Sequence, residues 1–140
     1  MLRSDVEALI HRHAESFASR DSFRLAGDHI EDGTFYSPAA GLVRGRPEIR
    51  KVYEYWLTAF PDLAFSWKTP LIDGNHAALF WHFGGTIEGK FFGEVKPGTR
   101  VEFDGAAEMI FSPDGIVSAH HLFDFTGALV AAGVFKIKSI

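Results

Sequence analysis

Cysteine is absent from the 140-residue chain. Disulfide bonds, thiol nucleophiles and thiolate metal sites are therefore excluded. No segment approaches the roughly 18 consecutive apolar residues of a membrane-spanning helix. The N-terminal segment MLRSDVEALIHRHAES has no apolar core of the kind that a secretory signal contains. We expect a cytoplasmic protein that does not interact with a membrane.

Positive charge is also scarce. The 14 Lys and Arg residues are outnumbered by 18 Asp and Glu residues, the formal net charge is −4, and no basic run is present. Proteins that bind nucleic acids need a basic surface that neutralises phosphates. We therefore expect no nucleic-acid partner.

Internal repeats and low-complexity segments are lacking as well. Hydrophobic residues make up 46% of the chain and charged residues 23%, which is typical of soluble globular proteins rather than disordered ones. A length of 140 residues suits one domain with one core. The sequence predicts a single domain over residues 1–140.

Phenylalanine, in contrast, is abundant, with 14 residues in this short chain. Aromatic side chains supply large apolar areas and line ligand cavities as well as cores. The composition therefore favours an apolar small molecule as the ligand.

The first half of the chain has the apolar spacing of helices, with apolar residues three and four positions apart. The pattern predicts a helix from about Ser4, as the N-cap, to residue 19, and a short helix through residue 25 capped by Asp21. The segment RPEIRKVYEYWLTAF predicts a third helix that Pro61 ends.

Strand patterns dominate the rest. GTFYSP predicts a short strand stopped by Pro38, followed by a loop with Gly41 and Gly45. After residue 61 the apolar period changes to two, which predicts strands over residues 63–71, 101–111 and 116–125. The segment over residues 76–89 is apolar on both faces, which predicts a central strand. This order predicts an α+β fold, in which about three N-terminal helices gather on one face of a strongly curved, mainly antiparallel sheet and leave a central pocket between the layers.

Five motifs resemble one known family in the same order along the chain. They are GRPEIRKVYEYWLTAFPDL, GGTIEGKFFG, PGTRVEF, PDGIV, and the terminal spacing of Asp124, Gly127, Leu129 and Gly133. The chain resembles the SnoaL-like polyketide cyclases, within the superfamily of nuclear transport factors and ketosteroid isomerases. The resemblance implies a cone-shaped α+β barrel closed by the N-terminal helices. That superfamily includes cyclases, isomerases, epoxide hydrolases, dehydratases and binding proteins without chemistry, so the resemblance indicates the fold more than the function.

Residue-by-residue comparison disfavours two activities of the superfamily. His13 stands where ketosteroid isomerase has its oxyanion-hole tyrosine, Ser37 where it has its catalytic base, and Ala107 where it has its second acid. The segment GKFFGE lacks the Arg-x-Asp pair of limonene-epoxide-hydrolase-like enzymes. The chain therefore lacks the complete set of catalytic residues for either activity.

Asp124 resembles the acid/base aspartate of SnoaL-like cyclases, which close a ring by aldol condensation without cofactor or metal. Strand alternation places His120 on the same face as Asp124 and His121 on the other face. The resemblance implies that the Asp124 side chain points towards the cavity. The predicted catalytic residues are therefore Asp124, His120 and His13. The alternatives are that Asp124 only caps a C-terminal helix and that both histidines are hydrogen-bonded core residues.

Aromatic and other apolar residues at helix and strand spacing are candidates for the cavity lining, although the same spacing is typical of ordinary core residues. The candidate substrate-binding residues are Phe17, Tyr36, Tyr53, Trp56, Trp67, Trp81, Phe103 and Met109.

No motif for a metal or cofactor is present, because neighbouring histidines diverge and the glycines do not lie between a strand and a helix. We expect none. Relatives commonly form dimers through the open face of the sheet, so the resemblance implies a homodimer. The leading hypothesis is acid/base cyclisation or isomerisation of a carbonyl-bearing apolar molecule. A pocket protein without catalysis, and a hydrolase or dehydratase, are the alternatives.

Overall fold

The computed structural model describes residues 1–138. Its helices are α1 (Arg3–Ser19), α2 (Ser22–Gly27), α3 (Arg46–Ala59) and α4 (Phe125–Ala132). Its strands are β1 (His29–Ser37), β2 (Gly41–Arg44), β3 (Ala64–Trp67), β4 (Leu71–Asp73), β5 (His76–Ile87), β6 (Thr99–Ser112) and β7 (Gly115–Phe123).

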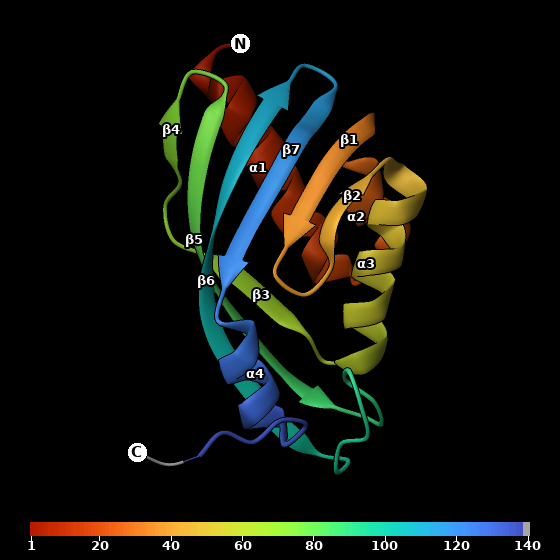
Figure 1. Cartoon of the computed structure of the whole chain (residues 1–140). Helices are drawn as coiled ribbons and strands as arrows, with labels where there is room; N and C mark the ends of the chain where they lie inside the picture. The colour runs from red at the N-terminus through yellow and green to blue at the C-terminus, as the bar shows by residue number, and fades with distance from the viewer. Residues whose placement is uncertain (139–140) are drawn as a thin grey trace.

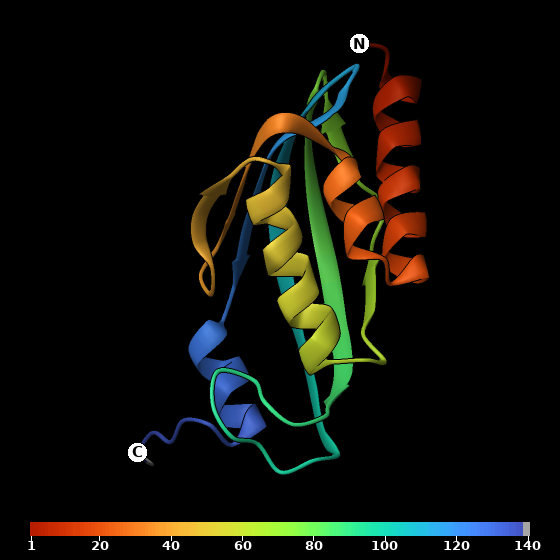
Figure 2. The same cartoon turned by 90° about the vertical axis from the view of Figure 1, so that its right-hand side faces the viewer.

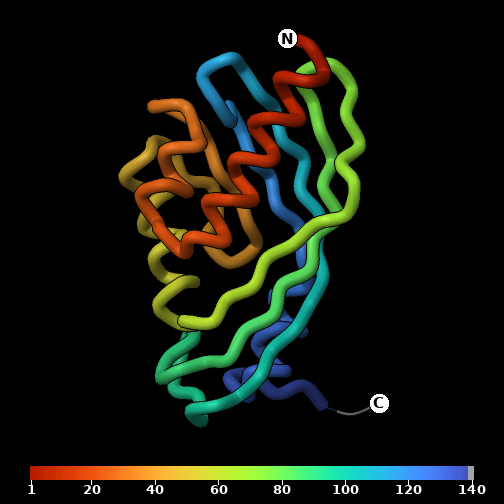
Figure 3. The backbone as a smooth tube through the Cα atoms, turned by 180° about the vertical axis from the view of Figure 1, so that it is seen from behind, coloured from red at the N-terminus to blue at the C-terminus, as the bar shows by residue number. Residues whose placement is uncertain are grey.

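The strands form one curved sheet in the order β2-β1-β7-β6-β5-β3, with β4 also paired to β5. All pairs are antiparallel except β1 with β7. Helices α1, α2 and α3 cover one face of the sheet, and α4 lies beyond the end of β7 (Figures 1 and 2). The view from behind shows α1 running obliquely across that face (Figure 3). The predicted α+β fold with three N-terminal helices and a curved sheet is confirmed.

Local hydrogen bonds determine where α1 and α2 begin. Asp21 caps α2 as predicted, because its carboxylate accepts hydrogen bonds from the backbone N–H groups of Phe23 and Arg24. The predicted cap Ser4 is wrong. Helix α1 already includes Ser4, and the Leu2 N–H donates to the Asp5 carboxylate at 2.9 Å.

Two strand predictions are also wrong. The glycine-bounded loop after Pro38 contains a short strand, β2, which forms a hairpin with β1 after a tight turn in which Gly41 has a φ of 71°. The strand predicted over residues 63–71 is two strands, β3 and β4, with Pro70 between them. Proline lacks the N–H that a continuous ladder requires.

The core lies between α3 and the concave face of the sheet. Its largest side chains are aromatic and contact one another closely, as in the edge-to-face pair of Phe60 and Phe83 at 4.8 Å between ring centroids. Gly85 makes this packing possible, since a Cβ there would lie 2.7 Å from the Phe60 ring. None of the helices in residues 1–138 combines the length and apolar character that a membrane crossing needs.

Candidate functional site

A small cavity of about 70 Å³ lies within this aromatic core. Aromatic rings make up most of its wall, and only a few polar side chains interrupt it. The lining residues are Phe17, Leu25, Phe35, Ser37, Val52, Tyr53, Trp56, Leu57, Leu63, Phe65, Trp81, Phe83, Phe103, His121 and Phe123.

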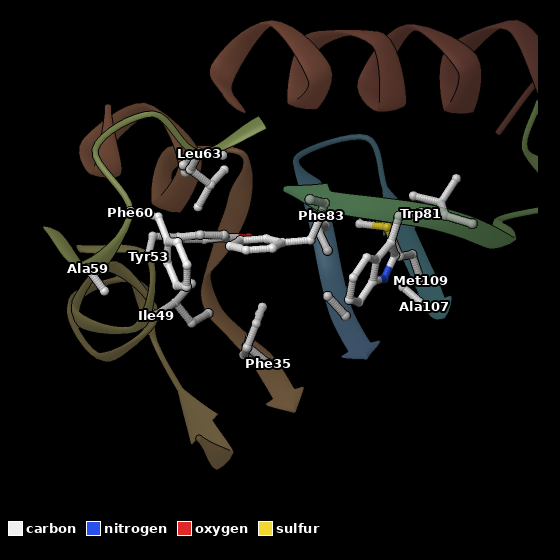
Figure 4. Packing of buried hydrophobic residues seen from close by; sticks show 14 of the residues in the cluster. Phe35, Ile49, Tyr53, Ala59, Phe60, Leu63, Trp81, Phe83, Ala107 and Met109 are labelled. Atoms are coloured by element: carbon white, nitrogen blue, oxygen red, sulfur yellow. The ribbon is translucent and has the colours of Figure 1, made fainter. Parts of the chain in front are cut away.

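Helical and strand periodicity bring these residues together. On α3, Tyr53 and Leu57 are four residues apart and share the face that packs on the sheet. On β5, Trp81 and Phe83 alternate inward, and Gly105 on β6 pairs with Trp81. A Cβ at Gly105 would lie 2.2 Å from the indole, so only glycine lets Trp81 lie across β6. Figure 4 shows Tyr53 reaching from α3 towards Phe83, with Trp81 beside Met109 and Ala107.

Tyr53 connects the cavity to a buried polar chain. Its Oη lies 2.8 Å from His29 Nε2 and 3.4 Å from His13 Nε2. His13 Nδ1 lies 2.8 Å from a carboxylate oxygen of Asp28, whose other oxygen accepts from Arg12 Nε at 3.2 Å. Because Asp28 is an acceptor, His13 donates to it from Nδ1, and His13 Nε2 faces the Tyr53 hydroxyl.

The buried chain shifts the acidity of its members. Burial raises the pKa of Asp28, but the hydrogen bond and charge of His13, together with Ser16 and Arg12, outweigh that effect, and the pKa lies below its ordinary value. Burial also raises the pKa of the Tyr53 hydroxyl and lowers the pKa of His29 well below its usual range. Tyr53 is therefore a neutral hydrogen-bond donor, and Asp28 is ionised.

His121 is the second titratable residue in the cavity wall. Its ring lies 5.1 Å from Phe35, 6.0 Å from Trp81 and 6.4 Å from Phe65, between centroids. Burial in this aromatic environment, together with the charges of His13 and His120, lowers its pKa to about 3. His121 is therefore a neutral imidazole at physiological pH.

Two further polar groups belong to the wall. Trp81 Nε1 is buried and has no hydrogen-bond partner within residues 1–138. Ser37 Oγ accepts a hydrogen bond from the Ala40 N–H at 3.0 Å. An unpartnered buried donor is costly, so Trp81 Nε1 is a candidate to bind an acceptor atom of a ligand.

The structure does not bring the three predicted catalytic residues together. His13 is buried and bonded to Asp28. His120 is exposed and stacks on Tyr36 at 4.4 Å, outside the cavity. Asp124 is exposed, and its carboxylate caps α4 by accepting from the Gly127 N–H at 2.9 Å. The placement of His120 and Asp124 towards the cavity is wrong, and their catalytic role stays a prediction.

The prediction assigned the wrong face of β7 to the cavity, although it grouped the residues of each face correctly. His120 and Asp124 do avoid the face of His121, as predicted, but the inward face is the one with Ala119, His121 and Phe123. Pairing with β6 sets His121 opposite Ala107 and His120 opposite Glu108. His121, excluded by the sequence prediction, is the histidine that lines the cavity.

Five of the eight predicted substrate-binding residues line the cavity: Phe17, Tyr53, Trp56, Trp81 and Phe103. The other three do not. Tyr36 lies on the outer face with His120, Trp67 packs on His13 at 6.2 Å, and Met109 is buried in the core.

Asp28 is the other functional candidate that the sequence did not reveal. Its position just after α2, beside the buried His29, was the available indication, but nothing local shows that α1 supplies His13 as its partner. Among residues 1–138, no three or more histidine, aspartate or glutamate side chains are arranged to hold a metal ion.

A family model described as SnoaL-like polyketide cyclase matches residues 8–131. No curated protein matches the chain. The fold is similar to that of AclR from Streptomyces galilaeus, with a TM-score of 0.81 and 24% identity over 97% of this chain and 89% of AclR.

Two other solved structures show the same architecture. IdmH from Streptomyces antibioticus has a TM-score of 0.77 and 23% identity, over 92% of this chain and 99% of IdmH. A protein from Catenulispora acidiphila with a ketosteroid isomerase-like fold, in complex with trimethylamine, has a TM-score of 0.77 and 17% identity, over 91% and 93% of the two chains. Identities at this level indicate a shared fold.

Proposed function

The chain belongs to the family of SnoaL-like polyketide cyclases, and from this premise we propose that its cavity performs acid/base chemistry on a carbonyl-bearing apolar molecule. Tyr53 and His121 are the groups that would touch the substrate. One observation supports this proposal most directly: an aromatic cavity contains two titratable side chains, and one of them ends a hydrogen-bonded chain to a buried carboxylate.

The Tyr53 hydroxyl suits the oxygen of the substrate. It stays neutral because burial raises its pKa, and a neutral phenol donates a hydrogen bond to the negative charge that develops on a carbonyl oxygen. Asp28 orients His13, and His13 orients Tyr53. His13 and Asp28 are thus positioning residues for the donor.

His121 suits the removal of a proton from carbon. A neutral imidazole can accept a proton, but a base whose pKa is lowered to about 3 has little driving force. The substrate carbon must therefore already be acidic, as it is between two carbonyl groups. A 1,3-dicarbonyl compound fits both the base and the apolar wall, and its enolate is the nucleophile of an aldol closure.

The test measures enolisation of 2-acetyl-1-tetralone, an aromatic 1,3-diketone, with 1-tetralone as the mono-ketone comparison. We expect the protein to accelerate enolisation of the diketone, and we expect Tyr53→Phe and His121→Phe each to reduce the rate at least about 100-fold. Stopped-flow absorbance follows the enol.

The outer face provides a matched control. Tyr36→Phe and His120→Phe make the same two substitutions in the stacked pair outside the cavity, and we expect them to leave the rate within about twofold of wild type. Loss of activity in His120→Phe, with retention in His121→Phe, would overturn the proposal and favour the original prediction for His120.

A second candidate is a ligand-binding protein without catalysis. The hydrogen bonds that already engage the Tyr53 hydroxyl favour it, since such a group must exchange a partner before it can bind substrate. Saturable binding of 2-acetyl-1-tetralone without any acceleration of enolisation would select this function.

A further inference from the structure

His29 is a buried titratable residue to which the proposed chemistry assigns no role. It begins β1, its side chain is fully buried, and it does not line the cavity. Its Nε2 lies 2.8 Å from Tyr53 Oη, whereas its Nδ1 is buried without a hydrogen-bond partner within residues 1–138. One nitrogen of the ring is engaged and the other is not, so the position of the ring proton determines what His29 does to Tyr53.

The unpartnered nitrogen locates the proton of the His29 ring. Burial holds the pKa of His29 well below its usual range, so the imidazole is neutral and carries one N–H. A proton on Nδ1 would bury an N–H group without an acceptor, whereas a proton on Nε2 meets the oxygen of Tyr53. Buried N–H groups without an acceptor are rare in proteins. The hydrogen bond therefore runs from His29 Nε2 to Tyr53 Oη.

This direction leaves the proton of the Tyr53 hydroxyl for another acceptor. In the described part of the chain, the other hydrogen-bond contact of the hydroxyl is with His13 Nε2 at 3.4 Å. That distance exceeds the roughly 3.2 Å at which ordinary hydrogen bonds end. Whichever of the two groups donates across it, this contact holds the hydroxyl proton weakly. A carbonyl oxygen in the cavity can therefore accept from Tyr53 while the shorter bond to His29 is kept.

Tyr53 lies at the boundary between the buried polar chain and the cavity. The rings of Phe17 and Phe35, which line the cavity, lie 5.8 and 5.7 Å from the Tyr53 ring. The rings of His29 and His13, which do not line it, lie 5.8 and 6.2 Å from the Tyr53 ring. His29 therefore acts on a ligand only through the Tyr53 hydroxyl.

The backbone around His29 is fixed on both sides. The His29 carbonyl accepts a hydrogen bond from Arg46 Nε at 2.8 Å, and His29 is paired with Ile116 of β7. A Cβ at the adjacent Gly115 would lie 2.5 Å from the Asp28 carbonyl oxygen, so glycine allows β7 to approach the start of β1 this closely. A donor held in place before charge develops is more effective than one that must first be ordered.

We propose that His29 is a positioning residue, which donates a hydrogen bond from Nε2 to Tyr53 Oη and directs the hydroxyl proton to the carbonyl oxygen of a ligand. The bond from His29 also strengthens the hydroxyl as a donor, because hydrogen bonds in a chain polarise one another. When a ligand binds, Tyr53 gives up the long contact with His13 and keeps His29. The inference rests on the proposed function in placing a carbonyl group in the cavity, and it requires no catalysis there.

The first measurement locates the ring proton of His29 in the wild-type protein. Nitrogen-15 NMR distinguishes protonated from unprotonated imidazole nitrogens, and correlations through the ring to the backbone of β1 assign them to His29. We expect a protonated Nε2 and an unprotonated Nδ1 at physiological pH. A proton on Nδ1 would overturn the proposal, and this result does not depend on whether a variant folds.

The second measurement follows the carbonyl stretch of bound 1-tetralone by infrared spectroscopy. A hydrogen bond from Tyr53 lowers the frequency of this band, so we expect binding to wild type to lower it and binding to His29→Leu to lower it less. His29→Gln supplies an amide N–H at a reach similar to that of Nε2 and should restore the shift. His82→Leu is the matched control, because it makes the same substitution at an exposed histidine of β5 outside the cavity.

The same variants are then compared in the enolisation of 2-acetyl-1-tetralone. We expect His29→Leu to lower kcat about tenfold with KM within about twofold of wild type, and His29→Gln to recover most of the loss. The proposal is overturned if the carbonyl band does not move in wild type, if His29→Leu behaves like His82→Leu, or if His29→Gln behaves like His29→Leu. A carbonyl shift that depends on His29, without any enolisation, would support the role of His29 and overturn only the proposed catalysis.

Discussion

The two faces of β7 place neighbouring histidines in opposite surroundings. His121 faces the aromatic cavity, where burial lowers its pKa to about 3. His120 faces solvent and stacks on Tyr36. Two aspartates differ in the same way, since Asp28 is buried against His13 while Asp124 is exposed as the cap of α4. The same type of side chain therefore has different surroundings according to whether it is buried or exposed.

The difference shows that burial separates the side chains that line the cavity or its polar chain from those that contact solvent. An exposed carboxylate or imidazole keeps its water, whereas a buried one depends on the few groups it touches. The following three changes test the contrast between the inner and outer sides, from the largest expected effect to the smallest.

Asp28→Ala should cause the largest loss of stability. It leaves the buried His13 Nδ1–H without its acceptor and removes the carboxylate that pairs with Arg12. Breaking such a buried pair costs about 3 kcal/mol or more. Urea unfolding at pH 7 measures the loss. Asp104→Ala removes an exposed partner of His82 and should cost less than about 0.5 kcal/mol; equal losses would contradict the contrast.

His121→Phe should make the protein less sensitive to acid. The folded pKa of His121, about 3, lies below its ordinary value of 6.5, so the unfolded chain binds a proton that the folded chain rejects. Wild type therefore loses stability as the pH falls from about 6.5 towards 3. Between pH 7 and pH 4.5 the free energy of unfolding should fall about 2 kcal/mol more in wild type than in the variant.

His120→Phe is the control for this measurement, because the same substitution is made on the outer face of the same strand. Its acid sensitivity should follow wild type. The contrast between the histidines fails if both variants respond to acid in the same way.

Asp124→Ala should have the smallest effect, a loss of about 1 kcal/mol from removal of the α4 cap. Asp124→Ser keeps a capping oxygen and should restore most of the stability measured by thermal unfolding. Both variants should retain enolisation of 2-acetyl-1-tetralone. Loss of that activity in Asp124→Ser, with stability intact, would reinstate Asp124 as the acid/base residue.

The prediction of the site succeeded where local periodicity was sufficient. The spacing of α3 placed Tyr53 and Trp56 correctly, and the alternation of β6 did the same for Phe103. The prediction failed for Asp124 and His120, because it assigned their side chains to the cavity from the family resemblance alone. Strand β7 ends at Phe123, before Asp124, and α4 begins at Phe125. The homodimer stays a prediction that light scattering can test.

The sequence by itself determined the α+β fold, the three N-terminal helices and which residues of the long strands share a face, because these follow from periods of 3.6 and 2 within short segments. Only the tertiary structure decided which face of β7 is buried and which histidine meets which aspartate. His13 and Asp28 are 15 residues apart, and Tyr53 is 40 residues from His13. Such contacts depend on how α1 and α3 pack across the curved sheet, and alternation along one strand contains no information about that packing.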